Sequence, residues 1–192
     1  MSRAAIFLDR DGVLNDPVPD GDGPPESPYH PEDVHLSTGA VEGARALRAA
    51  GFALVVVTNQ PAAAKGTATV AALMAVNSRV REVLADAAVE LDGWYTCLHH
   101  PAGTVPELSG PCDCRKPAAG MLLQAARELD LDLAASWIVG DSDSDVGAGE
   151  RAGVRTALVE HPGSAHRRSD LVAPDVRAAD LAEAAAAIVA AA

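Results

Sequence analysis

The sequence predicts an α/β fold, a three-layer, Rossmann-like arrangement in which a parallel β-sheet is flanked by helices on both faces. Short apolar runs, typical of strands covered on both sides, alternate along the chain with amphipathic segments of helical spacing. Strands that alternate with helices in this way form right-handed crossovers and a parallel sheet. With 192 residues, 48% of them hydrophobic, the chain can bury one core. We therefore expect a single domain over residues 1–192.

The strands are predicted from short apolar runs that end in polar or turn residues. The run FALVVV at residues 52–57 is continuous and rich in valine, as in a central strand of a parallel sheet. The run at residues 4–8 ends at Asp9, so an acidic side chain lies at its carboxyl end. In chain order, the predicted strands are residues 4–8, 52–57, 94–98, 137–139 and 154–159.

The helices are predicted from residues that favour helix ends and from apolar residues that share a face. Thr38 can cap the first helix with its side-chain oxygen, and Gly51 can end it. Pro117 suits the first turn of a later helix, where its missing N–H is not needed. The remaining predicted helices are residues 69–88, residues 145–152 and a helix from Asp180, while residues 160–170 are predicted to form a loop.

Polar side chains follow four of the predicted strands. Because the carboxyl ends of parallel strands meet at one edge of the sheet, where ligands bind in such folds, these side chains are candidates for a functional site. They are Asp9 and Asp11, then Thr58, Asn59 and Gln60, then the segment 97–116, and then residues 141–145.

Carboxylates dominate the first and last of these strand ends. Asp9 and Asp11 follow an apolar strand, where two carboxylates are costly unless a cation or a proton compensates them. Either they begin a solvated loop, or one is a nucleophile and metal ligand and the other a general acid/base. Asp141, Asp143 and Asp145 alternate after the fourth strand and can either cap a helix or supply oxygen ligands to Mg²⁺.

Two further elements could bind a phosphoryl group. Thr58 and Asn59 can either cap the next helix or donate hydrogen bonds to phosphoryl oxygens. Arg115 and Lys116 are either solvated surface residues or a fixed cationic pair that neutralises a transferred phosphoryl group.

Taken in order, these strand ends resemble the four motifs of the haloacid dehalogenase (HAD) phosphatase superfamily. The matching residues are Asp9 and Asp11 in the first motif, Thr58 in the second, Lys116 in the third, and Asp141 and Asp145 in the fourth. The resemblance covers essentially the whole chain and implies a Mg²⁺-dependent phosphoric monoester hydrolase with the HAD fold. The spacing between the motifs leaves no room for a cap domain.

The resemblance also implies a role for the motif carboxylates. Asp9 would attack phosphorus and form a phosphoaspartate. Asp11 would protonate the leaving alcohol and then activate water for hydrolysis. Mg²⁺ would bind the carboxylates of Asp9 and Asp141 and the main-chain carbonyl of Asp11.

All three cysteines lie close together, in Cys-Leu-His-His at 97–100 and Cys-Asp-Cys at 112–114. Three thiolates and one imidazole complete a tetrahedral set for Zn²⁺ and leave no open position, which favours a structural site. Free thiols are the alternative. His100 competes with His99 for the imidazole position, and the resemblance favours His99. The predicted zinc-binding loop spans residues 97–114, with Cys97, His99, Cys112 and Cys114 as ligands.

Within the superfamily, the zinc loop resembles two groups, the D-glycero-D-manno-heptose 1,7-bisphosphate 7-phosphatases and the histidinol-phosphate phosphatases. The long stretch between its two halves is more similar to the heptose group. Two positions depart from that group, since Pro61-Ala62 replaces Ser-Gly and Ser142 replaces a lysine. The expected phosphoryl ligands are Thr58 and Lys116, with Asp145 orienting Lys116 or the metal shell, and the further substrate-binding residues are Asn59, Gln60, Arg115 and Ser142.

The remaining features concern partners and surroundings. The net charge of −12 argues against a nucleic-acid partner. No apolar run is long enough to span a membrane, and an early acidic residue argues against a signal peptide. We therefore expect a cytoplasmic monomer that acts on a small sugar phosphate. The alternative function is that of a non-catalytic, zinc-organised phosphate-binding protein. The Pro- and Gly-rich segment 16–35 is interpreted either as a substrate-facing flap or as a disordered insertion.

Overall fold

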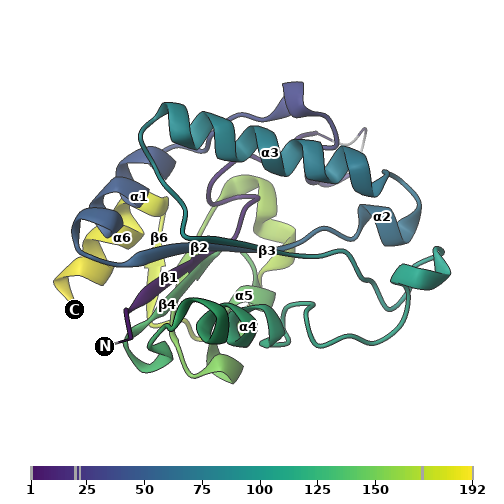
Figure 1. The fold of residues 1–192 in the computed structure, drawn as a ribbon. Helices are drawn as coiled ribbons and strands as arrows, with labels where there is room; N and C mark the ends of the chain where they lie inside the picture. The colour runs from purple at the N-terminus through teal and green to yellow at the C-terminus, as the bar shows by residue number, and fades with distance from the viewer. Residues whose placement is uncertain (1, 20, 22, 170, 192) are drawn as a thin grey trace.

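The computed structural model describes residues 2–19, 21, 23–169 and 171–191. Within these residues, six parallel strands form one sheet in the order β3-β2-β1-β4-β5-β6 (Figure 1). The strands are β1 (Ala5–Leu8), β2 (Ala53–Asn59), β3 (Gly93–Cys97), β4 (Trp137–Gly140), β5 (Arg155–Val159) and β6 (Val176–Ala178). The predicted α/β class is therefore confirmed.

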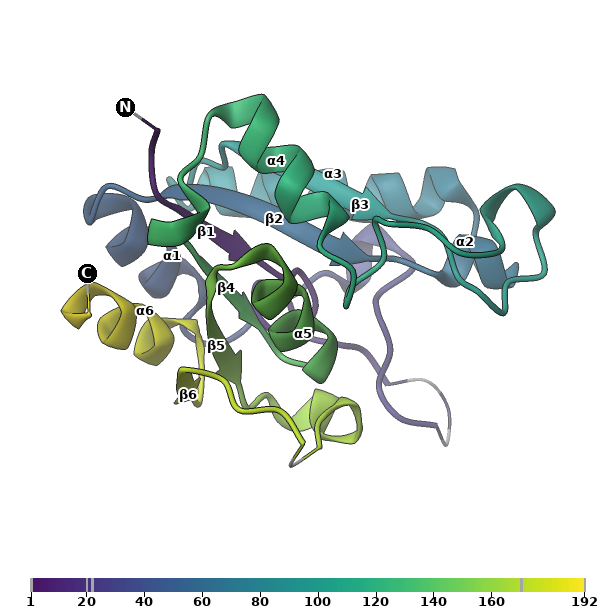
Figure 2. The same ribbon diagram turned by 90° about the horizontal axis from the view of Figure 1, so that it is seen from below.

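Helices cover both faces of this sheet (Figures 1 and 2). They are α1 (Ala40–Ala49), α2 (Ala62–Lys65), α3 (Val70–Asp86), α4 (Gly120–Leu129), α5 (Asp143–Ala152) and α6 (Leu181–Ala190), with 3-10 helices η1 (Pro31–Asp33), η2 (Pro106–Leu108), η3 (Leu133–Ala135) and η4 (Pro162–Arg167). Ile6 and Leu8 of β1 pack in one core cluster with α1, α3 and α6. Ala5 and Phe7 pack in a second cluster with α4 and α5. Successive side chains of β1 therefore point to opposite faces and contribute to a core on each side of the sheet.

The register of β1 brings three strand ends to one edge of the sheet. Leu8 pairs with Val56 of β2 and with Val139 of β4. The backbone N–H of Asp9 then donates to the carbonyl of Val139 at 2.9 Å. Because β1 lies between β2 and β4, the residues that end or follow these three strands become neighbours.

The structure adds short elements that the sequence does not predict. β6 has three residues and α2 has four, too few to display the period of a strand or a helix. The segment 160–170, predicted as a loop, contains η4. The predictions for these segments were therefore incomplete.

Two predicted helix starts are wrong. Gly39, with a φ of 74°, caps α1 in place of Thr38. α4 begins at Gly120, after Pro117, because the chain first folds back on the cysteine segment. The N–H of Gly120 donates to the carbonyl of Asp113 at 2.9 Å, and a Cβ at this position would lie 2.1 Å from that oxygen.

Each connection between the central strands contains at least one α-helix. β1 and β2 are joined through η1 and α1, and β2 and β3 through α2 and α3. Among the described residues, no helix has the length and apolar character needed to cross a bilayer.

Candidate active site

The site lies where the carboxyl ends of β1, β2 and β4 meet. Asp9 follows β1, Thr58 lies at the end of β2, and Asp141 follows β4. Lys116 reaches the same point from the loop before α4. All four side chains are almost completely buried.

Lys116 is held between two carboxylates. Its Nζ lies 2.9 Å from Oδ1 of Asp9 and 2.5 Å from Oδ1 of Asp145, and it donates to the carbonyl of Val57 at 2.8 Å. Burial alone would lower the pKa of Lys116, but the attraction of Asp145 and Asp9 outweighs it and raises the pKa. The ammonium is therefore charged and fixed in direction, as expected of a group that neutralises a phosphoryl oxygen.

Asp9 lies beside this ammonium with its carboxylate partly open to the surface. Oδ1 accepts a hydrogen bond from the backbone N–H of Arg10 at 2.7 Å. Burial, opposed by Lys116, raises the pKa of Asp9 to about 6. With 12% of its side chain exposed, against 1% for Lys116, Asp9 is the better placed of the two to reach a ligand from outside.

Asp141 is the carboxylate best suited to bind a cation. It is fully buried, and neither of its carboxylate oxygens has a hydrogen-bond partner. Burial, with the nearby charges of Asp9 and Asp145, raises the pKa of Asp141 to about 8. Oxygens of Asp9, Asp141 and Asp145 lie within 4.8 Å of one another, and an oxygen set of this kind fits Mg²⁺.

Gly12 makes room for Asp141. It adopts a φ of +79°, and a Cβ at this position would lie 2.1 Å from Oδ2 of Asp141. Any other residue would therefore collide with the unpartnered carboxylate and strain the backbone.

The buried charges of the described chain are all at this site. They are the carboxylates of Asp9, Asp11, Asp141 and Asp145 and the cations Arg10 and Lys116. When all six groups are ionised, two negative charges are left uncompensated, and burying them is costly. A divalent cation would balance them.

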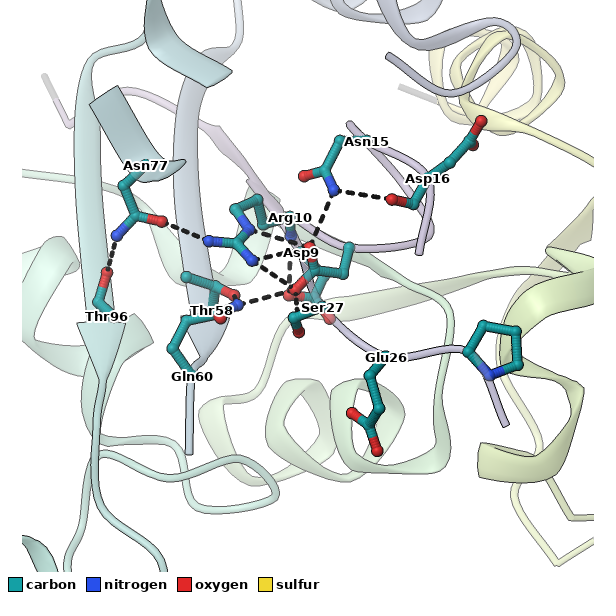
Figure 3. A network of polar contacts seen from close by, with 12 residues as sticks. Asp9, Arg10, Asn15, Asp16, Glu26, Ser27, Thr58, Gln60, Asn77 and Thr96 are labelled. Atoms are coloured by element: carbon teal, nitrogen blue, oxygen red, sulfur yellow. Dashed lines mark hydrogen bonds and ion pairs between the residues drawn. The ribbon is translucent and has the colours of Figure 1, made fainter. Parts of the chain in front are cut away.

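Asp11 is surrounded by donors, and Figure 3 labels the four residues that supply them, Arg10, Asn15, Ser27 and Gln60. Arg10 donates through Nε and Nη2 to its two carboxylate oxygens, each at 3.0 Å. Asn15, Ser27 and Gln60 donate to it at 2.9, 2.7 and 2.8 Å. Burial alone would raise the pKa of Asp11, but Arg10 and the three neutral donors hold it below its ordinary value.

Asn59 and Gln60, both predicted to bind substrate, make different contacts. The side chain of Asn59 bonds both backbone polar groups of Lys116, accepting from its N–H at 3.1 Å and donating to its carbonyl at 3.0 Å. Gln60 is fully buried, and its Nε2 donates to Asp11 and, at 2.9 Å, to Thr58 Oγ1. The structure does not bring Gln60 to the cavity wall, because both of its amide hydrogens are used inside the site.

A cavity of about 440 Å³ opens over the carboxylates. The predicted residues on its wall are Asp9, Asp11, Asn59, Arg115, Lys116 and Ser142. Sequence reasoning missed Glu26, Ser27, Lys65 and Arg167 as site residues, and Pro61, Asp143 and Ser144 complete the wall. Two of these come from the segment 16–35, which thus faces the cavity, and Arg167 comes from the basic segment 160–170, where the only signal was its charge.

Two side-chain contacts join the segments 16–35 and 160–170, and the first of them lies on the cavity wall. Arg167 pairs with Glu26 at 3.3 Å, and His161 Nε2 lies 3.1 Å from Oδ1 of Asp16. Arg168 also donates to the carbonyl of Asp141 at 3.3 Å. The stretch around Glu26 and the 3-10 helix η4 therefore form this side of the cavity.

The cysteine cluster forms beside the Lys116 loop. Ligand atoms of Cys97, His99, Cys112 and Cys114 lie within 4.8 Å of one another. The closest approaches are 2.8 Å between the sulfurs of Cys97 and Cys114 and 3.3 Å between Cys114 and His99 Nδ1. Burial raises the pKa of the Cys97 thiol, so a bound cation would be needed to hold it as a thiolate.

His100 is not part of this cluster. Its Nδ1 instead accepts a hydrogen bond from the N–H of Ala102 at 3.1 Å. Three thiols and one imidazole gathered in this way supply the donor set of a tetrahedral zinc site.

Comparisons with known proteins agree with this chemistry. Residues 113–188 match a family model described as HAD-hydrolase-like. Over 162 residues, the chain is 42% identical to D-glycero-beta-D-manno-heptose-1,7-bisphosphate 7-phosphatase from Yersinia pestis, covering 84% of this chain and 82% of that protein. Over 161 residues, it is 37% identical to the corresponding alpha-named 7-phosphatase from Photorhabdus laumondii, covering 82% of this chain and 84% of that protein.

A solved structure of a heptose bisphosphate phosphatase is also similar to this chain. D,D-heptose 1.7-bisphosphate phosphatase from B. bronchiseptica, complexed with magnesium and phosphate, has a TM-score of 0.81 and 30% sequence identity to this chain. The match covers 98% of this chain and 99% of that one.

Proposed function

Since this chain belongs to the family of D-glycero-D-manno-heptose 1,7-bisphosphate 7-phosphatases within the HAD-like hydrolases, we propose that it hydrolyses the 7-phosphate of a heptose 1,7-bisphosphate. The chain is thus a phosphatase. The observation that carries the proposal is Lys116 held against Asp9, beside the unpartnered carboxylate of Asp141 and under an open cavity. The beta-named enzymes from Yersinia pestis and Photorhabdus laumondii are 42% and 38% identical to this chain and the alpha-named enzyme from Photorhabdus laumondii is 37% identical, so the β-anomer is the first substrate to test.

Asp9 and Asp141 would hold Mg²⁺ with their carboxylates, and Asp11 with its main-chain carbonyl. The two unpartnered oxygens of Asp141 and the unbalanced buried charge support this assignment, as does the magnesium complex of the related B. bronchiseptica enzyme. When bound, the ion supplies positive charge that lets a carboxylate and a phosphate approach one another.

Asp9 is the proposed nucleophile. A carboxylate oxygen of Asp9 forms a bond to phosphorus as the bond to the sugar oxygen breaks, which leaves a phosphoaspartate. Lys116 stabilises the charge on the transferred group, and Asp145 keeps its ammonium in place. The Thr58 hydroxyl accepts from Gln60, so its proton remains for a phosphoryl oxygen.

Asp11 is the proposed general acid/base. It gives a proton to the leaving sugar oxygen and then takes one from the water that hydrolyses the phosphoaspartate. Asp11 is thus protonated again at the end of the cycle, and phosphate is released.

The cysteine cluster is proposed to bind a structural Zn²⁺. Cys114 directly precedes Arg115, whose Nη1 donates to the carbonyl of His99 at 3.4 Å. Lys116 follows, and the close contact between Gly120 and Asp113 ties the cluster to the start of α4. A closed zinc site would therefore fix the direction from which Arg115 and Lys116 enter the active site.

Substrate selectivity is proposed to come from the cavity wall. Arg115 and Lys65 offer positive charge, whereas Arg167 is paired with Glu26 and the Ser142 hydroxyl donates to Asp145. A sugar that carries two phosphates would use this charge outside the reacting centre. We propose a single-domain monomer that works in the cytoplasm.

A substrate panel tests the proposal. Phosphate release is measured with the α- and β-anomers of heptose 1,7-bisphosphate and with histidinol phosphate, each with and without Mg²⁺. We expect Mg²⁺-dependent release with the highest kcat/KM for the β-anomer. A preference for histidinol phosphate would overturn the substrate assignment, and no hydrolysis of any of them would support a phosphate-binding role instead.

A further inference from the structure

Arg10 is the largest fully buried side chain of the described residues. It lies between the two aspartates of the first motif, and the mechanism above gives its side chain no part. Because it is 0% exposed, it cannot reach a substrate in the cavity. A buried guanidinium is costly, so its presence calls for an explanation.

The guanidinium joins Asp11 to the helix layer above the sheet. Two of its nitrogens donate to the two oxygens of Asp11, each at 3.0 Å. The third, Nη1, donates to Oδ1 of Asn77 at 2.6 Å. A two-pronged contact of this kind fixes the plane of a carboxylate, which a single hydrogen bond cannot do.

Asn77 is itself held in place. Its Nδ2 donates to Oγ1 of Thr96 on β3 at 3.2 Å, and that oxygen also accepts from Trp94 Nε1 at 3.1 Å. Figure 3 shows Asn77 between Thr96 and Arg10, so the contacts run from β3 through α3 to the first motif. Arg10, Asn77 and Thr96 are not among the residues that line the cavity.

The sequence of α3 marks Asn77 as unusual. The buried residues of this helix are Leu73, Val76, Asn77, Val80 and Leu84, so an amide stands in an otherwise apolar face. An apolar residue there would leave Nη1 of the buried Arg10 without this acceptor. Packing alone therefore does not explain Asn77.

We propose that Arg10 and Asn77 are positioning residues that fix the direction of the Asp11 carboxyl for proton transfer to the leaving oxygen. The inference rests on the proposed phosphatase function. The two-pronged contact holds the ionised carboxylate of Asp11, so the oxygen that then takes up the proton is already in place. Asn77 acts only through Arg10, and Arg10 only through Asp11.

The effect of a misdirected Asp11 carboxyl on the reaction rate depends on the leaving group. A sugar oxygen leaves as an alkoxide unless it is protonated, so its departure needs a well-aimed acid. A p-nitrophenolate anion leaves without a proton. Since kcat/KM reports the steps up to phosphoryl transfer, a misdirected Asp11 lowers kcat/KM for the sugar phosphate selectively.

The experiment compares kcat/KM for heptose 1,7-bisphosphate and for p-nitrophenyl phosphate in Asn77→Ala, Arg10→Lys and Val80→Ala. Val80 is a buried α3 residue outside the contacts and serves as the packing control. For Asn77→Ala, we expect the sugar-phosphate value to fall about 10- to 100-fold more than the aryl-phosphate value, as displacement of a catalytic group would predict. Arg10→Lys, which keeps the charge but loses the two-pronged contact, should show the same selective loss.

Two results separate the hypotheses. Equal losses on both substrates in Asn77→Ala and Arg10→Lys, as in Val80→Ala, would overturn the positioning role. If Asn77→Ala does not fold, Arg10→Lys decides alone. A wild-type protein that hydrolyses neither substrate would instead overturn the proposed function.

Discussion

The side chain of Asn59 bonds both backbone polar groups of Lys116, at 3.1 Å to the N–H and 3.0 Å to the carbonyl. Asn59 ends β2, whereas Lys116 lies in the loop before α4. The second and third motifs are thus joined by one amide. This contact sets where the ammonium of Lys116 meets Asp9.

Replacing Asn59 should therefore damage the site without touching its charges. For Asn59→Ala, we expect a loss of about 1–3 kcal/mol in the free energy of unfolding, because two hydrogen bonds disappear. We expect kcat to fall, since Lys116 is no longer fixed. Asn59→Asp keeps the acceptor for the Lys116 N–H but turns an oxygen toward the Lys116 carbonyl, so it should not restore the wild-type stability. Denaturant unfolding measures the change in stability, and steady-state kinetics measure the change in kcat. An unchanged kcat in Asn59→Ala would refute the role of Asn59 in fixing Lys116.

The stabilising effect of Mg²⁺ should depend on pH. Without metal, burial raises the pKa of Asp9 to about 6 and that of Asp141 to about 8, from an ordinary value of 3.8. At a pH between the ordinary pKa of 3.8 and these raised pKa values, the folded state holds more protons than the unfolded chain. The stability of the folded state therefore falls as pH rises from about 4 to about 8. Mg²⁺ takes the place of these protons.

Mg²⁺ should therefore raise Tm more at pH 8 than at pH 6. Thermal unfolding with and without the ion at each pH gives the comparison. Asp141→Asn is the control, and Mg²⁺ should change its Tm little at either pH. A larger rise at pH 6 in the wild-type protein would contradict the assignment of Asp141.

Gly12 should be irreplaceable for metal binding. In Gly12→Ala, the new Cβ would lie 2.1 Å from Oδ2 of Asp141, and the φ of +79° adds backbone strain. Gly153 has a φ of +73°, and a Cβ added there would meet no atom within 4 Å, so Gly153→Ala reports the strain alone. We expect each variant to lose about 1–2 kcal/mol from strain, and only Gly12→Ala to lose Mg²⁺-dependent phosphate release. Equal activities in the two variants would show that the clash is relieved.

Zinc removal should lower stability and activity together. Cys114 directly precedes Arg115 and Lys116, so opening the cluster frees the loop that carries the cationic pair. Chelator treatment, and Cys97→Ser separately, should lower Tm by several degrees and reduce kcat. His100→Ala, outside the cluster, is the matched control. If zinc-free protein kept both its Tm and its kcat, the cluster would have no part in the site.

The sequence predicts the central strands and their functional ends well, because continuous apolar runs followed by polar residues have few other interpretations. Residues 52–57 are an example, since their valines fit only a strand covered on both faces. Short elements such as α2 and β6 are not predicted, because three or four residues cannot display the period of a helix or a strand.

Side-chain direction is the part that the sequence does not predict. Asn59 and Gln60 stand next to each other after β2, yet one bonds the Lys116 backbone and the other bonds Asp11. The role of Arg10 is equally hidden, because its partner Asn77 is on a distant helix. The net charge of −12 also says little about the site, where Arg10 and Lys116 offset part of the buried negative charge.

The central claim is that Asp9 attacks phosphorus. Asp9→Asn keeps the size of the side chain and an oxygen acceptor near Lys116 but removes the nucleophilic carboxylate. Mg²⁺-dependent phosphate release from heptose 1,7-bisphosphate should fall at least about 10³-fold in this variant, as for loss of a nucleophile, with Tm close to the wild-type value. Undiminished phosphate release by Asp9→Asn would contradict the account.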